Sequence, residues 1–304
     1  MHIPDGFLDA KTALATGVLA VAGLGLALRR VRQSFPPQRI PLLGLAAAFI
    51  FAAQLLNFPV AGGTSGHLLG GALAAVLLGP AAAVVAMSAV LVLQCLLFSD
   101  GGVTALGANL FNMAVVAPVV AWAVFRPLER IAGRGGAVAL AAWLSTVIAA
   151  LVCAGELAWS GRVAWHLVLP AMGGVHALIG LGEALITTLI LGAIAAARPE
   201  LLEATAPAHR RDLIGLGLLV ALGLVVLVAP FACPWPDGLE RVAARLGFEQ
   251  HTAQLLKAPL ADYAVPGLPW EKLGTVISGV IGTLAVFVAA WAVVRMIGKK
   301  AHNV

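Results

Sequence analysis

Charged residues are scarce in this chain of 304 residues. Asp, Glu, Lys and Arg make up 11% of it and hydrophobic residues 61%, and the mean hydropathy is +0.99. A soluble globular domain carries about 25% charged residues. The composition therefore excludes a soluble domain and predicts an all-α polytopic membrane protein.

Several signatures of enzymes are absent as well. No G-x-x-x-x-G-K-[ST] loop occurs, so the chain cannot hydrolyse ATP through a P-loop. Neither H-E-x-x-H nor G-x-S-x-G is present to indicate an intramembrane hydrolase. The three cysteines have no C-x-x-C spacing, and the polar opening HIPDG lacks the basic region of a cleavable signal peptide. We therefore expect neither an ATPase nor a hydrolase, no resident cofactor, and partners that include the membrane and no nucleic acid.

Long apolar runs indicate about nine transmembrane helices, because about 20 apolar residues span the hydrocarbon core. Seven belong to a core over residues 1–204 and two to a C-terminal region over residues 205–304. The nine expected spans lie at 11–30, 40–58, 67–79, 82–98, 106–126, 136–159, 175–197, 212–231 and 273–296. The short 67–79 span should stop at Gly79-Pro80, where a helix cannot continue.

The distribution of Lys and Arg predicts the orientation. With the N-terminus outside and the C-terminus in the cytoplasm, six of the nineteen basic residues face outward and the others face inward. The outward six are Lys11, Arg162, Arg241, Arg245, Lys257 and Lys272, and most of them lie in or beside the long 232–272 loop. We therefore expect a multi-pass protein of the cytoplasmic (inner) membrane.

The pair Met1-His2 is a candidate metal chelate. A free α-amine, the backbone nitrogen of residue 2 and the imidazole Nδ1 of a His at that position close two fused rings with nitrogens in one plane. Tetragonal nitrogen ligation favours Ni(II) or Cu(II) over tetrahedral Zn(II). Because His is too bulky for ordinary removal of the initiator Met, we expect the amine to remain on Met1. Many proteins begin Met-His without binding metal, so the pair alone is a weak signal.

Two outer loops lie on the same predicted side as Met1. The 58–66 loop is rich in glycine and leads to His67, which is either the fourth ligand or an interfacial His bonded to water. The 99–105 loop begins a polar segment that carries Asp100, Asn109 and Asn112. These loops can therefore converge with the N-terminus at one outer site.

Three blocks in this order resemble the substrate-specific membrane component of energy-coupling-factor transporters for nickel and cobalt. They are MHIPDGFL, GGTSGHLLGGALAAVLLGP and DGGVTALGANLFNM, and the resemblance covers roughly residues 1–200. It implies a square-planar metal site formed by the amine of Met1, the backbone nitrogen and side chain of His2, and His67. It also implies that Asp100, Asn109 and Asn112 orient the ligands without touching metal, as outer hydrogen bonds do in metal sites.

The same resemblance implies the cargo and the partners. HIPDG and GTSGHLLGG look like the nickel branch, whereas the cobalt branch more often reads HIMEG and SSHPTG, so Ni(II) is the expected substrate and Co(II) the alternative. The partners implied are a transmembrane coupling (T) protein and two cytoplasmic ATPases. The block PDGLE-V-A-x-x-x-GF resembles the small auxiliary component of these transporters, fused here to the C-terminus. It also predicts an amphipathic helix with Asp237 as N-cap.

Polar residues at membrane depth are a further expectation. Ser65, His176 and Glu183 are candidates to line the cavity beneath the metal, and for His176 the alternative is a packing or capping role. A membrane-buried carboxylate such as Glu183 is a functional hypothesis by default, or else a packing residue hydrogen-bonded near Thr187. If Glu183 carried protons, the chain would be an autonomous ion-coupled permease. An intramembrane metalloenzyme is a third alternative, but four nitrogen ligands leave no position for a reacting water.

Overall fold

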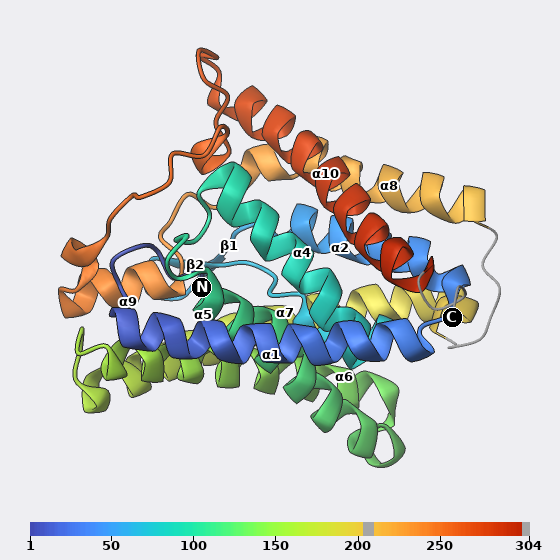
Figure 1. The fold of residues 1–304 in the computed structure, drawn as a ribbon, viewed down its shortest axis with the longest axis horizontal. Helices are drawn as coiled ribbons and strands as arrows, with labels where there is room; N and C mark the ends of the chain where they lie inside the picture. Colours follow the sequence, from blue (N-terminus) through green and yellow to red (C-terminus); the bar gives the residue numbers. More distant parts are fainter. Residues whose placement is uncertain (203–209, 300–304) are drawn as a thin grey trace.

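A computed structural model describes residues 1–202 and 210–299, and most of them are helical. An α-helix pairs its own backbone polar groups, which lipid cannot do for it. Long helices make up most of the molecule (Figure 1), as the all-α prediction requires.

Six helices of the described residues are long and apolar enough to cross a membrane, so the predicted count of nine is not confirmed. They are α1 (Ala10–Ser34), α4 (Pro80–Phe98), the continuous stretch Leu106–Trp159, α7 (Trp165–Ala197), and the spanning parts Asp212–Phe231 and Glu271–Ile297. Two expected spans are too short: α2 (Ile40–Gln54) has 15 residues and α3 (Gly71–Leu78) has 8. Both are buried among other helices, so packing against protein replaces the missing length.

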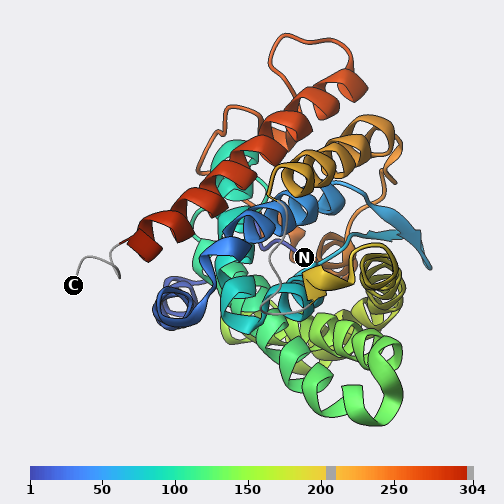
Figure 2. The same ribbon diagram turned by 90° about the vertical axis from the view of Figure 1, so that its right-hand side faces the viewer.

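The stretch Leu106–Trp159 contains two of the predicted spans. It consists of α5 (Leu106–Asn109), a π-helical segment (Leu110–Val116) and α6 (Ala117–Trp159). Its 54 residues would extend about 80 Å as one straight helix, far more than a bilayer core of about 30 Å. Gly133 breaks the helix with a φ of 68°, and the chain reverses there (Figure 2).

The predicted stop at Gly79-Pro80 is confirmed. Gly79 has a φ of 83° and ends α3, and Pro80 is the first residue of α4. Proline lacks a backbone N–H, and at the first position of a helix that group would make no intrahelical hydrogen bond. Gly70 begins α3, also with a φ of 83°. A Cβ on Gly70 would lie 2.6 Å from Ile50 Cγ2, so α3 and α2 approach closely at this glycine.

One short β-hairpin departs from the all-α prediction. β1 (Phe58–Val60) pairs antiparallel with β2 (Thr64–Gly66), with Phe58 opposite Gly66. The turn contains Gly62 and Gly63, both with positive φ, which glycine adopts without strain. The hairpin gives the backbone of this loop hydrogen-bond partners and leads directly to His67.

The C-terminal region packs along the core. α8 (Arg210–Leu227) and α10 (Glu271–Lys299) both contact α2, and α9 (Gly238–Leu246) contacts α7. The predicted N-cap is confirmed: Asp237 accepts from the backbone N–H groups of Leu239 and Glu240. Short 3-10 turns lie at Pro37–Arg39, Pro199–Leu202, Ala229–Phe231, Glu249–His251 and Ala261–Tyr263. The predicted boundary at 204/205 lies outside the described residues.

One end of the bundle collects the predicted outer segments. The start of α1, the hairpin, α9 and the N-terminus lie toward the left of Figure 1, and the last turns of α1 and α10 lie toward the right. The fold thus brings the N-terminus, both glycine-rich loops and the PDGLE segment to one place.

Candidate metal-binding site

The N-terminal segment is buried in this end of the bundle. Met1, Ile3 and Phe7 are 6%, 0% and 3% exposed. Asn109 clamps the segment with both groups of its amide: Oδ1 accepts from Ile3 N (2.8 Å), and Nδ2 donates to Ile3 O (3.0 Å). The backbone of residue 3 is therefore fixed in two directions, which positions residues 1 and 2.

The glycine pair of the 99–105 loop allows this close approach. Gly102 N donates to Ile3 O at 2.9 Å. A Cβ on Gly102 would lie 2.2 Å from Asp5 N, and one on Gly101 would lie 2.8 Å from Asn109 Nδ2. Any side chain at either position would push the N-terminal segment out of place.

The Met1 amine faces an imidazole and a carboxylate. It lies 3.2 Å from His67 Nε2 and 2.5 Å from Asp237 Oδ2. The other ring nitrogen, His67 Nδ1, lies 3.0 Å from Leu68 O. A carbonyl oxygen only accepts hydrogen bonds, so His67 Nδ1 carries the proton and Nε2 presents its lone pair toward the amine.

The Met1 amine, the His67 imidazole and the Asp237 carboxylate shift one another's pKa. Burial is the largest single influence on the pKa of the Met1 amine and lowers it, but the charge and hydrogen bond of Asp237, with the charges of Asp100 and Glu240, together leave that pKa above its usual range. Burial, followed by the nearby ammonium, lowers the pKa of His67 to about 4. Burial acts to raise the pKa of Asp237, but the ammonium holds that pKa below its usual range. The metal-free site therefore holds an ammonium–carboxylate pair beside a neutral imidazole.

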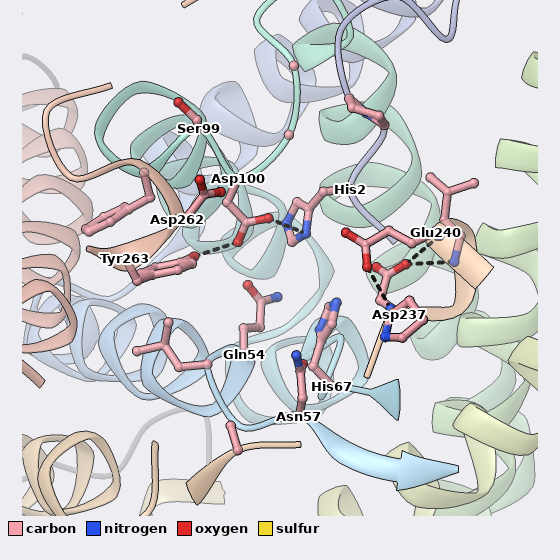
Figure 3. A pocket seen from close by; sticks show the side chains of 18 of the residues that line it. His2, Gln54, Asn57, His67, Ser99, Asp100, Asp237, Glu240, Asp262 and Tyr263 are labelled. Carbon is pink, nitrogen blue, oxygen red and sulfur yellow. Dashed lines mark hydrogen bonds and ion pairs between the residues drawn. The ribbon is translucent and has the colours of Figure 1, made fainter. Parts of the chain in front are cut away.

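His2 lies on the other side of this group (Figure 3). Its Nδ1 is 3.0 Å from Asp100 Oδ1, its Nε2 is 3.2 Å from Gln94 Oε1, and its ring centroid is 5.7 Å from that of His67. Tyr263 donates its hydroxyl to Asp100 Oδ2 at 2.5 Å. Burial lowers the pKa of His2, against the opposing charge of Asp100. Burial and the charge of Asp100 raise the pKa of the Tyr263 hydroxyl well above its usual range, so Tyr263 remains a donor.

Glu183 holds the loop that carries His67. It is 1% exposed, and its two oxygens accept from Leu69 N (2.5 Å) and Gly70 N (2.9 Å). Leu69 and Gly70 lie just before α3, where a negative group also meets the positive end of the helix dipole. Its partners are these backbone amides, and no bond joins it to Thr187, the neighbour that the sequence suggested. Glu183 therefore anchors the loop that carries His67.

Three other predicted residues have different neighbours. Asn112 lies in the π-helical segment and donates to Glu156 Oε2 of α6 at 2.7 Å, and it does not bond a ligand loop. Ser65 donates to Trp235 O at 2.7 Å and so joins the hairpin to the PDGLE segment. His176 lies beneath Met1 and His67, where all three line a cavity of about 20 Å³.

A much larger cavity opens above His2 and His67, with a volume of about 1470 Å³ (Figure 3). Tyr263 and the segment around residues 229–244 form part of its wall, so both the core and the C-terminal region enclose it. Seven carboxylates line it: Asp5, Asp100, Asp237, Glu240, Glu249, Asp262 and Glu271. Such an acidic surface raises the local concentration of cations.

Two important partners were not assigned to the site from sequence. Asp237 is predicted only as a helix cap, and Gln94 has no predicted role in the site. Both lie in contact with the N-terminus across 236 and 92 residues of chain. Among the described residues, no cluster of three or more His, Cys, Asp or Glu side chains has the spacing of a metal site. A chelate built on Met1 and His2 would not form such a cluster, because two of its nitrogens belong to the main chain.

The fold and the site together describe a membrane transport component, and the sequence has none of the motifs G-x-x-x-x-G-K-[ST], H-E-x-x-H and G-x-S-x-G. The comparisons agree. Residues 2–201 match the family CbiM, the cobalt uptake substrate-specific transmembrane region, and residues 211–299 match the PDGLE domain. The chain belongs to the CbiM family and carries a PDGLE domain fused behind the CbiM region.

Relatives and solved structures extend this assignment. The chain is 41% identical over 297 residues to a putative fused nickel transport protein, NikMN, of Archaeoglobus fulgidus, covering 97% of this chain and 98% of the relative. It is 36% identical over 206 residues to a cobalt transport protein, CbiM 1, of Pelobacter propionicus, covering 64% of this chain and 90% of the relative. A crystal structure of a transition metal transporter superposes with a TM-score of 0.61 at 31% identity, covering 72% of this chain and 99% of that one.

Proposed function

We propose that this protein captures Ni(II) on the outer side of the cytoplasmic membrane and passes it inward as the substrate-specific component of an energy-coupling-factor transporter. The observation that carries the proposal is the buried Met1 amine, 3.2 Å from the free nitrogen of His67 and next to His2. The amine, the backbone nitrogen of His2, an imidazole nitrogen of His2 and His67 Nε2 supply four nitrogens. Four nitrogens in a plane suit Ni(II).

Metal binding requires two contacts of the metal-free site to change. The amine must give up the proton that it shares with Asp237, and His2 Nδ1 must exchange its contact with Asp100 for the metal. Asp237 and Asp100 then remain beside the ligands, where their negative charge offsets that of the bound ion. The acidic cavity above them gives a hydrated cation a route to the chelate.

The second candidate is Co(II), which the description of the matching family favours. Low-spin Co(II) also accepts a planar nitrogen field, so the donor set alone does not separate the two metals. The sequence blocks HIPDG and GTSGHLLGG support nickel, as do the names of fused relatives such as the one from Archaeoglobus fulgidus. Competition between the two ions for the purified protein measures the preference directly.

The energy for uptake comes, in this proposal, from a T protein and two cytoplasmic ATPases, since the chain has no P-loop of its own. The N-terminus lies outside and the C-terminus inside, as the basic loops indicate. The alternative of an autonomous permease requires Glu183 to carry protons, but both of its oxygens are occupied by backbone amides of the His67 loop. Nickel uptake by cells with and without the ATPases distinguishes the two mechanisms.

The test of the site is the free amine. One residue added before Met1 moves His2 out of the chelate, so nickel binding by the purified protein in detergent should be lost. The same residue added after Val304 is the matched control and should leave binding unchanged. Intact-mass measurement establishes which N-terminus each preparation carries. Near-native affinity in the N-terminally extended protein would overturn the proposed site.

A further inference from the structure

Two buried glutamines connect the two ligand segments. Gln54 Nε2 donates to Leu69 O (2.8 Å), and Gln94 Nε2 donates to Gln54 Oε1 (2.7 Å). Gln94 Oε1 then faces His2 Nε2 at 3.2 Å. A single line of hydrogen bonds therefore runs from the loop that follows His67 to the ring of His2.

The order of donors and acceptors along this line of hydrogen bonds is set by the backbone carbonyl at one end. Leu69 O is a backbone carbonyl and can only accept, so Gln54 must present its NH₂ group to it and its oxygen to Gln94. Gln94 must then present its NH₂ group to Gln54 and its oxygen to His2. An oxygen can only accept, so His2 Nε2 must carry a hydrogen.

We infer that Gln54 and Gln94 are positioning residues that hold the proton of His2 on Nε2 and so keep Nδ1 available as a metal ligand. The inference rests on the proposed function, because it concerns the nitrogen that the chelate needs. In a chelate with the backbone nitrogen of the same residue, Nδ1 is the imidazole atom within reach. His67 has the opposite arrangement, with its hydrogen on Nδ1 and Nε2 free, imposed by Leu68 O.

The reverse arrangement is less favourable for a physical reason. A neutral His2 with its hydrogen on Nδ1 could donate to Asp100. Its Nε2 would then be an acceptor, so the side-chain amides of Gln94 and Gln54 would both have to flip. After that flip Gln54 Oε1 would face Leu69 O at 2.8 Å, the distance that now separates Gln54 Nε2 from Leu69 O. Gln54 is 6% exposed and Gln94 is 0% exposed, and two acceptors that face each other in so buried a place are costly. The Asp100 side chain is 27% exposed, so water can serve its Oδ1 while its Oδ2 keeps the hydroxyl of Tyr263. The buried end of the line therefore decides the tautomer.

The same residues couple the two ligands. The Leu69 peptide donates to Glu183 through its nitrogen and accepts from Gln54 through its oxygen. A displacement of the His67 loop therefore reaches His2 through two side chains. Outer partners of this kind orient ligating imidazoles and set which nitrogen binds metal.

The first experiment observes the tautomer itself in the metal-free wild-type protein. Selective ¹⁵N labelling of the seven histidines, with the His2 signals assigned by their loss in His2→Ala, reports which ring nitrogen carries hydrogen. We expect Nε2 of His2 to be protonated at every pH at which the protein is folded. A neutral ring with its hydrogen on Nδ1 would overturn the inference and leave the nickel site itself untouched.

The second experiment breaks the line. Gln94→Met keeps the volume of the side chain but removes the acceptor, and Gln54→Leu removes the link to Leu69. Each should weaken nickel binding by about 10–100-fold and increase the share of His2 rings with hydrogen on Nδ1. A protonated Gln54→Glu side chain still donates to Leu69 O and accepts from Gln94, so it should recover most of the affinity that Gln54→Leu loses.

Gln33→Met, on the exposed last turns of α1, is the matched control for the exchange of amide for thioether. Unchanged nickel affinity in Gln94→Met would show that the line has no positioning role. Absence of nickel binding by the wild-type protein with a free Met1 amine would instead contradict the proposed function, whatever the tautomer of His2.

Discussion

Nickel binding should release protons, and the structure specifies which ones. The metal-free Met1 amine is an ammonium, because Asp237 keeps its pKa above the usual range despite burial. The backbone N–H of His2 is a second proton that the chelate must displace. Burial lowers the pKa of His67 to about 4 and also lowers the pKa of His2, so we expect these rings to release fewer protons than the amine and the backbone N–H.

The sign and size of the pH effect follow from this count. Each proton displaced makes the apparent affinity about tenfold stronger per unit rise in pH, so two protons correspond to about 100-fold per unit. Between pH 7 and pH 5 the apparent Kd should therefore rise by about 10⁴-fold. Toward pH 4 the slope steepens, because His67 begins to take up a third proton.

The assay is equilibrium nickel binding in detergent from pH 5 to pH 8. Asp237→Asn removes the charge that holds the ammonium, so the pKa of the amine falls and the slope should drop from two protons toward one at the alkaline end first. Asp262→Asn removes a carboxylate from the wall of the same cavity and should leave the slope unchanged. A wild-type slope of one proton or less would refute the chelate, whereas a slope of three would place a further proton between His2 and Asp100.

Three further predictions concern single residues. His67→Ala should weaken nickel binding while the absorption of a planar nickel complex partly persists, because the three nitrogens of Met1 and His2 remain; an unchanged Kd would place the fourth ligand elsewhere. Asn109→Ala should cost about 10–100-fold in affinity, since it releases Ile3 without touching metal; complete loss of binding in a folded protein would make Asn109 a ligand. Glu183→Gln should weaken binding and raise hydrogen exchange at the Leu69 amide, because a neutral amide oxygen accepts less strongly than a carboxylate; unaltered exchange there would contradict the anchoring role.

Much of the architecture depends on local chemistry and can therefore be predicted from the sequence. Low charge and long apolar runs require a helical membrane protein, since lipid offers backbone groups no partners. Gly79-Pro80 ends one helix and begins the next, and Asp237 caps α9, because a ring without an N–H and a short acceptor side chain act within one turn. The count of spans was less predictable, because a buried segment such as α3 is as apolar as a spanning one.

The tertiary structure alone decided which polar groups meet. Asp237 is a local helix cap, yet its second oxygen reaches the Met1 amine 236 residues away, and this contact acts to raise the pKa of that amine. Asn109 and Asn112 are near neighbours in sequence, but only Asn109 faces the N-terminal segment. The direction of the line from Leu69 to His2 depends on one buried carbonyl. Hydrogen-bond partners and pKa values follow from distances between remote segments, so only the packed fold determines them.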